Sequence, residues 1–316
     1  MKYLWRYCRV HLLLIVLIGM TGAVGAADTP QEPVPSMRSL WIISSSNNRF
    51  FRRSIRRIEE RMAAHVDRIV KIHSDEIEQR RDDLAQASLI VTLGARAMRQ
   101  ISAMDLDRPL LHAYLTRYQY LSDPPLPGSH SLLLDQPLER HLRFNRELTG
   151  ARNIGLLNVK MTAWDTEQLQ QLARSEGVEV EQKLIDPEQG NPVAEVRKIL
   201  QNNDNLLALP VPVLYNRKTL KGILLAAYRL RKPVLSYSPA HVRAGALGAL
   251  YATPEQIGDQ IADVALPWLL GQAPTTAHEL ARYFAIDINR QVATALGIHP
   301  PSAEQLQQAI EDAIQP

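Results

Sequence analysis

Short apolar runs alternate with segments of helical periodicity from Ser39 onward. The predicted strands in the first part of the chain are residues 40–43, 68–72, 88–92 and 109–114. Between them, apolar residues recur at every third or fourth position, which predicts helices at about 50–65 and 74–85 and another from about residue 95. Strands that alternate with helices in this way form parallel sheets with helices on both faces. The pattern therefore predicts an α/β fold.

The alternation breaks at residues 117–136 and then restarts. Two pairs, Pro124-Pro125 and Pro127-Gly128, together with several serines are typical of a linker or a crossover. Beyond this segment we predict helices at about 138–149, 164–175, from Pro192 onward and at 219–230, and strands at 153–157, 178–181, 206–209, 233–237 and 247–251. Two similar α/β halves joined by loops are the simplest interpretation, although a single large sheet would give the same pattern.

The N-terminus has the pattern of a secretory signal peptide. Three basic residues, Lys2, Arg6 and Arg9, accompany an apolar run at residues 12–18, and small residues then place the cleavage site after Ala26. The apolar run is short for a membrane span, and an uncleaved anchor is the alternative. We therefore predict a signal peptide at 1–26, a flexible polar and Pro-rich lead-in at 27–38, and a periplasmic protein.

Cleavage changes the composition of the chain in two ways. The sequence has 36 Lys and Arg against 33 Asp and Glu, and three of the basic residues lie in the signal peptide, so 33 of each sign remain. A mature chain without net charge gives no support to nucleic-acid binding. Cys8, the one cysteine, precedes the apolar run, so it cannot carry the lipid of a lipoprotein, and the mature chain can form no disulfide.

Motifs of enzyme and cofactor sites are missing from the sequence. Residues 44–48, after the first strand, lack the Gly-x-Gly-x-x-Gly of dinucleotide sites, and the chain has neither a phosphate-binding Gly-Lys-Ser/Thr loop nor a Gly-x-Ser-x-Gly elbow. The nine histidines are scattered without metal-ligand spacing. Carboxylate pairs such as Asp75-Glu76 lie in charge-rich helices, where a solvated face is expected. We predict no enzyme activity, no cofactor and no metal site.

Four arginines on the first predicted helix suggest an anion site: Arg52, Arg53, Arg56 and Arg57. They are interleaved with the apolar stripe and point outward, and Glu59 and Glu60 are within helical reach. A solvated face is therefore the favoured interpretation, with a functional patch as the alternative.

Polar or aromatic residues follow many of the predicted strands. In open α/β sheets, ligands bind beyond the carboxyl ends of the strands, where helix N-termini offer free N–H groups. Gly94 lets the backbone approach a ligand, and the amides that follow it could hold a carboxylate. The candidate ligand-binding residues are Ser46, Asn47, Thr92, Gly94, Ala95, Tyr114, Asn158, Pro210, Tyr215, Tyr237 and Tyr251.

The segment from Val234 to Gly271 resembles a known family. It contains Val-x-x-Gly-Ala-Leu at residues 242–247, followed by a helix with Gly258 that ends in Leu-x-Gly at residues 269–271. These features are similar to the ABC-transporter substrate-binding proteins that include tryptophan- and tyrosine-binding periplasmic proteins. Weaker matches lie at residues 91–97, 153–158 and 288–300, so the resemblance covers about residues 39–304.

The resemblance implies the type I periplasmic-binding-protein fold, with two Rossmann-like lobes of parallel sheet flanked by helices and a ligand cleft between them. The expected lobes are 39–125 with about 240–270, and 135–238 with about 275–316. The loops after Thr92, Asn158, Leu209 and Leu250 would line the cleft. The implied partners are a small-molecule ligand and an ABC permease, or alternatively a membrane sensor protein that receives a signal without transport.

The sequence departs from the family where acidic residues commonly hold a ligand amine. Those loops read Pro210-Val211-Pro212-Val213-Leu214-Tyr215 and Tyr251-Ala252-Thr253 here. The departures favour an apolar or aromatic solute that is less cationic than an α-amino acid, with tyrosines available to stack on it.

Overall fold

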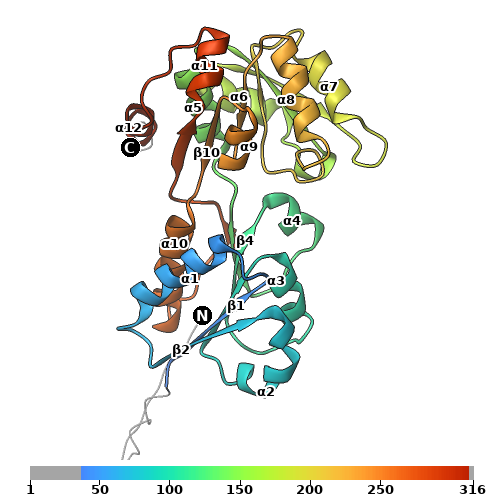
Figure 1. The fold of residues 1–316 in the computed structure, drawn as a ribbon. Helices are drawn as coiled ribbons and strands as arrows, with labels where there is room; N and C mark the ends of the chain where they lie inside the picture. The colour runs from blue at the N-terminus through green and yellow to red at the C-terminus, as the bar shows by residue number, and fades with distance from the viewer. Residues whose placement is uncertain (1–36, 313–316) are drawn as a thin grey trace, which may run out of the picture. The chain divides into compact units, whose positions relative to one another are not determined.

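Residues 37–312 are described by the structure, a computed structural model, and they form two lobes (Figure 1). The predicted signal peptide and the lead-in as far as residue 36 lie outside the described residues. Each lobe contains one six-stranded sheet, which confirms two α/β halves over a single large sheet. Within residues 37–312, none of the helices has the length and apolar character needed to span a bilayer.

The two sheets have the same strand order. In lobe 1 the order is β2 (Arg68–His73), β1 (Ser39–Ser44), β3 (Leu89–Leu93), β4 (Leu110–Leu115), β5 (His130–Leu133) and β11 (His278–Glu279). In lobe 2 it is β7 (Glu179–Leu184), β6 (Asn153–Asn158), β8 (Asn205–Leu207), β9 (Val234–Ser236), β10 (Gly248–Tyr251) and β12 (Ala285–Ile288). Neighbouring strands are parallel, except that β12 joins β10 antiparallel. Parallel strands place their carboxyl ends at one edge, so each lobe presents one loop-rich edge.

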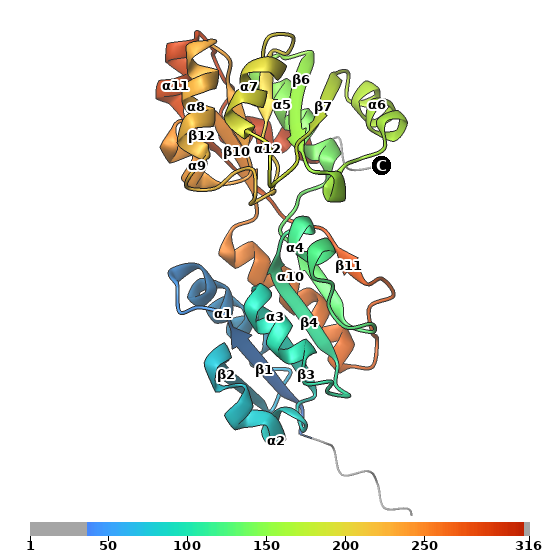
Figure 2. The same cartoon turned by 90° about the vertical axis from the view of Figure 1, so that its right-hand side faces the viewer.

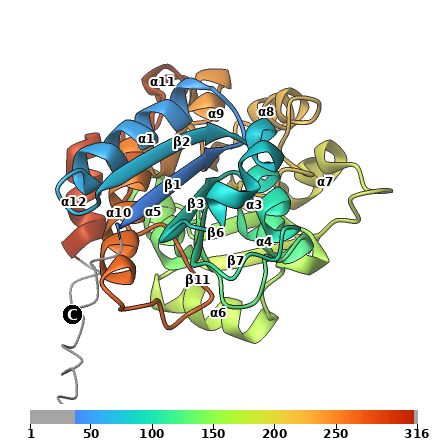
Figure 3. The same ribbon diagram turned by 90° about the horizontal axis from the view of Figure 1, so that it is seen from below.

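Helices cover both faces of the lobe 1 sheet. The helices α1 (Arg49–Met62) and α10 (Pro254–Leu269) lie side by side on one face, where Ile58 and Ile261 pack on the alternate residues Leu40 and Ile42 of β1 (Figures 1 and 3). On the other face α2 (Arg81–Leu84) and α3 (Ala95–Ser102) cover Trp41 and Ile43. The short helix α4 (Arg117–Ser122) follows β4. This burial on both faces explains the continuous apolar runs of the strands.

Lobe 2 is built in the same way (Figure 2). One face packs against α5 (Leu138–Thr149), α6 (Thr166–Ser175), α11 (Arg290–Leu296) and α12 (Ala303–Asp312). The other packs against α7 (Pro192–Ile199) and α8 (Leu220–Arg229), and α9 (Pro239–Ala244) follows β9. The N-cap residue Asn191 accepts hydrogen bonds from the backbone N–H groups of Val193 and Ala194, as its position before Pro192 suggests.

The chain passes between the lobes at residues 134–137, 252–253 and 280–284. These crossings differ from the expected lobe boundaries. Residues 240–251 had been expected in lobe 1, but β10 pairs with β9 in lobe 2. Residues 278–279 had been expected in lobe 2, but β11 pairs with β5 in lobe 1. Apolar periodicity identifies a strand but carries no information on which sheet it joins.

Two predicted segments differ from the structure. Residues 117–136, interpreted as a linker, contain α4 and the fully buried strand β5. The polar residues His130 and Ser131 occupy two of the four positions of β5, so the apolar signal of a buried strand is absent there. The helix predicted at 74–85 is two 3-10 turns at Ser74–Glu76 and Glu78–Arg80, followed by the four-residue helix α2.

A buried histidine in the lobe 1 sheet makes the fold sensitive to acid. His112 on β4 is fully buried and its Nδ1 lies 2.8 Å from Thr92 Oγ1. Burial, assisted by nearby His130, lowers the pKa of His112 to about 4. The unfolded chain takes up this proton near pH 6.5, so between pH 6.5 and 4 the unfolded state binds more protons and stability falls as the pH drops.

We therefore expect His112→Gln to lose less stability than the wild type between pH 7 and pH 4.5, by about 2–3 kcal/mol. Urea unfolding at a series of pH values measures the difference. His65→Gln, at an exposed position on the same lobe, is the control and should follow the wild-type profile. Parallel profiles for wild type and His112→Gln would assign the acid sensitivity to other groups.

Candidate ligand cleft

Two cavities lie at the carboxyl ends of the strands and are lined by residues of both lobes. The first, of about 290 Å³, is called the aromatic pocket because four aromatic rings line it: Phe50, Tyr114, Tyr237 and Tyr251. The second, of about 610 Å³, is called the polar pocket, and its lining includes Arg117, Asp135, Glu139, Trp164, Gln168 and His278. Pro210 lines both, so the two pockets adjoin.

Tyr114 is held rigidly at the lobe 1 side of the aromatic pocket. It lies where the β4–β5 register shifts and has a φ of 61°, a left-handed conformation that costs energy for a bulky residue. Its ring packs edge-on against Phe51 at 4.6 Å between centroids, and its hydroxyl lies 2.6 Å from Ser54 Oγ. Burial raises the pKa of Tyr114 to about 12, so the hydroxyl stays protonated and can donate a hydrogen bond. Strain of this kind is concentrated at binding sites.

The lobe 2 side of the aromatic pocket is formed by residues that follow β9 and β10. The Tyr237 ring packs edge-on against His241 at 4.9 Å, and Ser236 Oγ lies 2.6 Å from His241 Nδ1. Tyr251 ends β10 and is half-buried. The rings therefore come from strand ends of different lobes, as a ligand cleft between two α/β domains requires.

Arg117 connects the lobes beside the polar pocket. Its Nη1 donates a hydrogen bond of 2.6 Å to the backbone oxygen of Thr162 in lobe 2, and its guanidinium lies 5.1 Å from the centre of the Trp164 ring. The neighbouring Tyr118 packs against the lobe 2 core. The start of α4 therefore reaches across the cleft.

Asp135 is the acidic group of the first crossover. Its Oδ2 accepts a hydrogen bond of 2.6 Å from the backbone N–H of Arg117. Its backbone oxygen accepts the N–H of Ala281 from the third crossover at 3.0 Å. Burial raises the pKa of Asp135 to about 6, against the lowering effects of the hydrogen bond from the Arg117 N–H, of the Arg117 charge and of the Asp135 backbone N–H.

The structure brings four of the predicted site residues together in the aromatic pocket: Tyr114, Pro210, Tyr237 and Tyr251. Asn47 lines a separate cavity of about 400 Å³ beside α1 and β2 with Arg52, Arg56 and Lys71. Ser46 is half-buried beyond β1.

Three other predicted residues lie in the interior: Thr92, Asn158 and Tyr215. Asn158 holds the turn at Lys160–Thr162 by donating to the backbone oxygen of Thr162 at 2.9 Å and accepting from the N–H of Val159 at 2.9 Å. Tyr215 is only 3% exposed and packs in the lobe 2 core.

At the start of α3, after Gly94, a side chain of the protein takes a backbone N–H group that could otherwise have bound a ligand. Gly94 has a φ of 93°, and a Cβ there would lie 2.9 Å from Ser45 Oγ. Ser45 Oγ accepts the backbone N–H of Ala97 at 2.9 Å. Glycine is needed here to let Ser45 reach α3, and Gly94 and Ala95 are not among the residues that line the two pockets.

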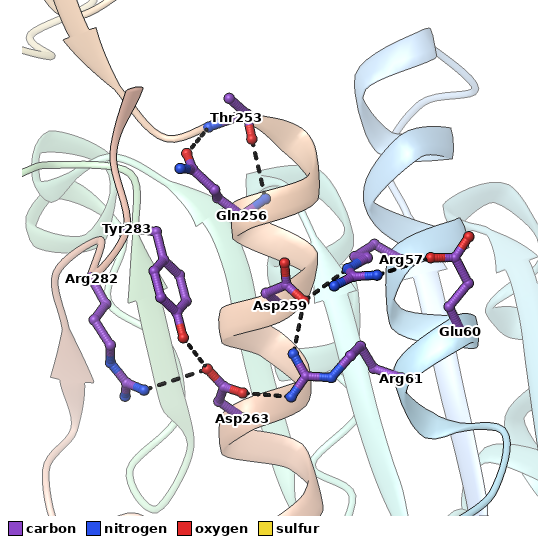
Figure 4. Close-up of polar contacts among 9 residues, drawn as sticks. All are labelled: Arg57, Glu60, Arg61, Thr253, Gln256, Asp259, Asp263, Arg282 and Tyr283. Carbon is purple, nitrogen blue, oxygen red and sulfur yellow. Dashed lines mark hydrogen bonds and ion pairs between the residues drawn. The ribbon is translucent and has the colours of Figure 1, made fainter. Parts of the chain in front are cut away.

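Two arginines of α1, Arg57 and Arg61, pair with acidic residues of α10 where the two helices lie side by side, a contact called the helix seam (Figure 4). Arg57 and Arg61 donate to Asp259 Oδ1 at 2.8 and 2.7 Å, and Arg61 also reaches Asp263 at 2.9 Å. Glu60 pairs with Arg57 at 3.2 Å, as helical spacing predicted, but the closer partners are on α10. The Tyr283 hydroxyl donates to Asp263 at 2.7 Å and so ties the third crossover to the same seam.

Asp259→Asn should therefore lower the melting temperature by a few degrees at low ionic strength, because it weakens two hydrogen bonds that join α1 to α10. In 1 M NaCl, where exposed ion pairs are screened, the difference should shrink. Calorimetry at low ionic strength and in 1 M NaCl measures the difference in melting temperature between the wild type and Asp259→Asn. Glu60→Gln is the matched control, because it leaves the contacts between α1 and α10 intact. An unchanged difference at high salt would contradict an electrostatic role.

Within residues 37–312, no cluster of three or more histidine, cysteine or acidic side chains is arranged to hold a metal ion. The residues that line the two pockets can stack on a ring, donate or accept hydrogen bonds, and offer a carboxylate. Such an arrangement is typical of a binding site.

Comparison with solved structures identifies the fold. A substrate binding protein with adhesive properties from Clostridium difficile, in its ligand-free, open structure, superposes with a TM-score of 0.62 at 15% identity, covering 84% of this chain and 97% of that one. An ABC domain in complex with L-Trp from Streptococcus pneumonia gives 0.55 at 16% identity, over 85% and 98%. The chain has the type I periplasmic-binding-protein fold.

The XylFII–LytSN complex shares this type I fold with a TM-score of 0.56 at 12% identity, covering 82% of this chain and all of that one. No protein-family model matches the sequence, and no curated protein matches it. The structural neighbours confirm the resemblance found at residues 39–304 as one of fold. Because the match covers nearly the whole of each neighbour, the shared fold includes both lobes.

Proposed function

We propose that this protein is an exported solute-binding protein that captures a small solute with an apolar or aromatic part between its lobes and delivers it to an ABC-type importer. The observation that carries the proposal is the aromatic pocket, where rings from both lobes surround about 290 Å³. A ligand held by both lobes favours their closure, because it gains contacts in the closed state that it lacks in the open state.

The N-terminal sequence and the structural neighbours support export to the periplasm. Basic residues, a short apolar run and a small-residue cleavage site precede the folded lobes. One neighbour is a substrate binding protein, another is a periplasmic ribose ABC transporter, and the streptococcal ABC domain is in complex with L-Trp. A binding role also agrees with the absence of a nucleophile–base pair from the residues that line the two pockets.

A periplasmic ligand sensor is the second candidate function. Its support is the XylFII–LytSN neighbour, in which a protein of this fold is in a complex. Genes for a permease and an ATPase beside this one favour transport, whereas a neighbouring membrane receptor gene favours signalling. Measuring uptake of the solute by a strain that lacks this gene separates transport from sensing directly. Uptake should be lost if the protein serves an importer and should be unchanged if it only signals.

Thermal unfolding with a solute library tests the binding role. The protein is first unfolded and refolded to remove any solute carried through purification, and its melting temperature is then measured with each compound. A binder at 100 times its Kd adds about 2.7 kcal/mol of stability, which gives a readily measured shift. If no solute with an aromatic or apolar part raises the melting temperature, the proposal is wrong.

A further inference from the structure

We propose that lobe 2 binds the surface of anionic phospholipid membranes through the exposed side of α8. The segment from residue 217 to residue 232 has six basic residues and no acidic residue. Together with three exposed apolar residues they are called the basic face: Arg217, Lys218, Lys221, Leu225, Tyr228, Arg229, Leu230, Arg231 and Lys232. None of them is among the residues that line the aromatic and polar pockets, so the basic face is separate from the proposed solute site.

The helix α8 lies beside α7 on one face of lobe 2, with one side buried and the other in water (Figures 1 and 2). Ile223 and Ala227 pack in the lobe 2 core. Lys221, Leu225 and Tyr228 recur at helical spacing on the exposed side, where Leu225 is 45% and Tyr228 63% exposed. A side that faces only water is normally polar, so these apolar residues indicate a surface that meets something other than water.

The cations of the basic face are available to an external anion. Among residues 37–312, no carboxylate oxygen lies within 4.0 Å of a side-chain nitrogen of these six residues. Asp204 lies near Lys232, but its carboxylate accepts the backbone N–H groups of Arg152 and Asn153 at 3.0 and 2.9 Å. On neighbouring α7, by contrast, an exposed lysine pairs with a glutamate at 2.7 Å.

The charge of the whole chain favours one orientation on an anionic surface. The chain that follows the predicted cleavage site has 33 basic and 33 acidic residues, and six of the basic ones lie in the basic face. The remaining residues therefore have an excess of six acidic groups. An anionic surface repels this remainder and attracts the basic face, so α8 should turn toward the membrane.

The apolar residues of the basic face favour a lipid surface over a purely ionic partner. Membrane binding strengthens with buried apolar area as well as with basic charge, and tyrosine is a preferred residue at the membrane–water interface. A nucleic acid or an acidic protein tail would use the cations alone. At the end of α8, a cavity of about 580 Å³ is lined by residues that include Arg152, Asp204, Arg231 and Lys232. Its excess of positive charge suits a lipid phosphate.

Co-sedimentation with lipid vesicles tests the proposal. The mature chain, residues 27–316, is used because the predicted signal peptide is itself basic and apolar. At low ionic strength it should bind vesicles of phosphatidylglycerol in phosphatidylcholine at least about tenfold more tightly than vesicles of phosphatidylcholine alone, and 1 M NaCl should remove most of the difference. Equal binding to both kinds of vesicle, or binding to neither, would overturn the proposal and leave the proposed solute binding intact.

Two double variants separate the contributions of charge and apolar area. Lys221→Glu with Arg229→Glu should weaken binding to the anionic vesicles at least about tenfold. Leu225→Ser with Tyr228→Ser keeps the charges and should weaken it at least about threefold. If the second variant binds vesicles like the wild type, and polyglutamate binds the protein as tightly as the vesicles do, the surface recognises an acidic protein and the lipid proposal is wrong.

Arg174→Glu with Arg290→Glu is the matched control. It changes the net charge by the same amount, but both residues are exposed on α6 and α11, which cover the opposite face of the lobe 2 sheet. It should bind the anionic vesicles within about threefold of the wild type, because the basic face is unchanged. A loss as large as that of Lys221→Glu with Arg229→Glu would assign the binding to net charge and overturn the proposal. Melting temperatures close to that of the wild type establish that all three variants are folded.

Discussion

Gly258→Ala should destabilise the protein by about 2–3 kcal/mol, although alanine is the better helix former by about 1 kcal/mol. Gly258 lies within α10 where α1 crosses it. A Cβ at this position would lie 2.8 Å from the backbone oxygen of Ser54 and 2.8 Å from Arg57 Cβ. A backbone oxygen inside a helix cannot move aside without shifting the helix, so overpacking outweighs the gain in propensity. Gly258→Val should destabilise the protein further.

Gly222→Ala in α8 is the matched control. Its Cβ would also meet an atom at 2.8 Å, but that atom is the Cγ2 methyl of Val193, at the end of a side chain that can rotate. The gain in helix propensity and the cost of the close contact then nearly cancel, so the free energy of unfolding should change by less than about 1 kcal/mol. Urea unfolding of the three variants measures the contrast. If Gly258→Ala were as stable as the wild type, α1 and α10 would have to pack less closely than these distances indicate.

The sequence predicts the repeated α/β architecture because burial on both faces leaves a clear apolar signal in most strands. The residues of β1, β3 and β6 are almost entirely buried, and their predicted ranges match the structure within one or two residues. The sequence could not predict which lobe β10 and β11 join, because a strand is assigned to a sheet by its pairing partners. Pairing is a long-range property that local periodicity does not contain.

The missed strand β5 also hid an acidic residue that lines the polar pocket. His130 and Ser131 are buried in that strand, so a polar pattern hides a core element. Without the strand, Asp135 could not be identified as a residue that follows a strand end, and it is not among the predicted site residues. Phe50, at the start of α1, was missed for a related reason, because it is separated from the strand end by the Asn48 cap.

The arginines of α1 show what spacing along a single helix cannot predict. Their interpretation as an exposed face followed from helical spacing, but spacing within one helix cannot reveal a partner about 200 residues away. Asp259 and Asp263 lie one helical turn apart on α10 and meet Arg57 and Arg61, which are one turn apart on α1. The matched spacing on both helices could have suggested the seam.

Tyr215→Ala should mainly reduce stability and Tyr251→Ala should mainly weaken binding, although both tyrosines lie at or beyond the carboxyl end of a strand. Tyr215 is 3% exposed in the lobe 2 core, so its truncation should cost about 3–5 kcal/mol of stability. Tyr251 is half-buried and lines the aromatic pocket, so its truncation should change stability by about 1 kcal/mol or less while weakening binding of an aromatic solute such as tryptophol about tenfold.

Urea unfolding and calorimetric titration with tryptophol measure both quantities for each variant. Tyr228→Ala, at a position of α8 that is 63% exposed, is the control and should alter neither. A large loss of stability in Tyr251→Ala would make that residue part of the core and remove one ring from the proposed site. Weaker binding by Tyr215→Ala at a temperature where it is fully folded would instead place Tyr215 behind the pocket wall, where its backbone oxygen accepts the Tyr237 hydroxyl at 3.4 Å.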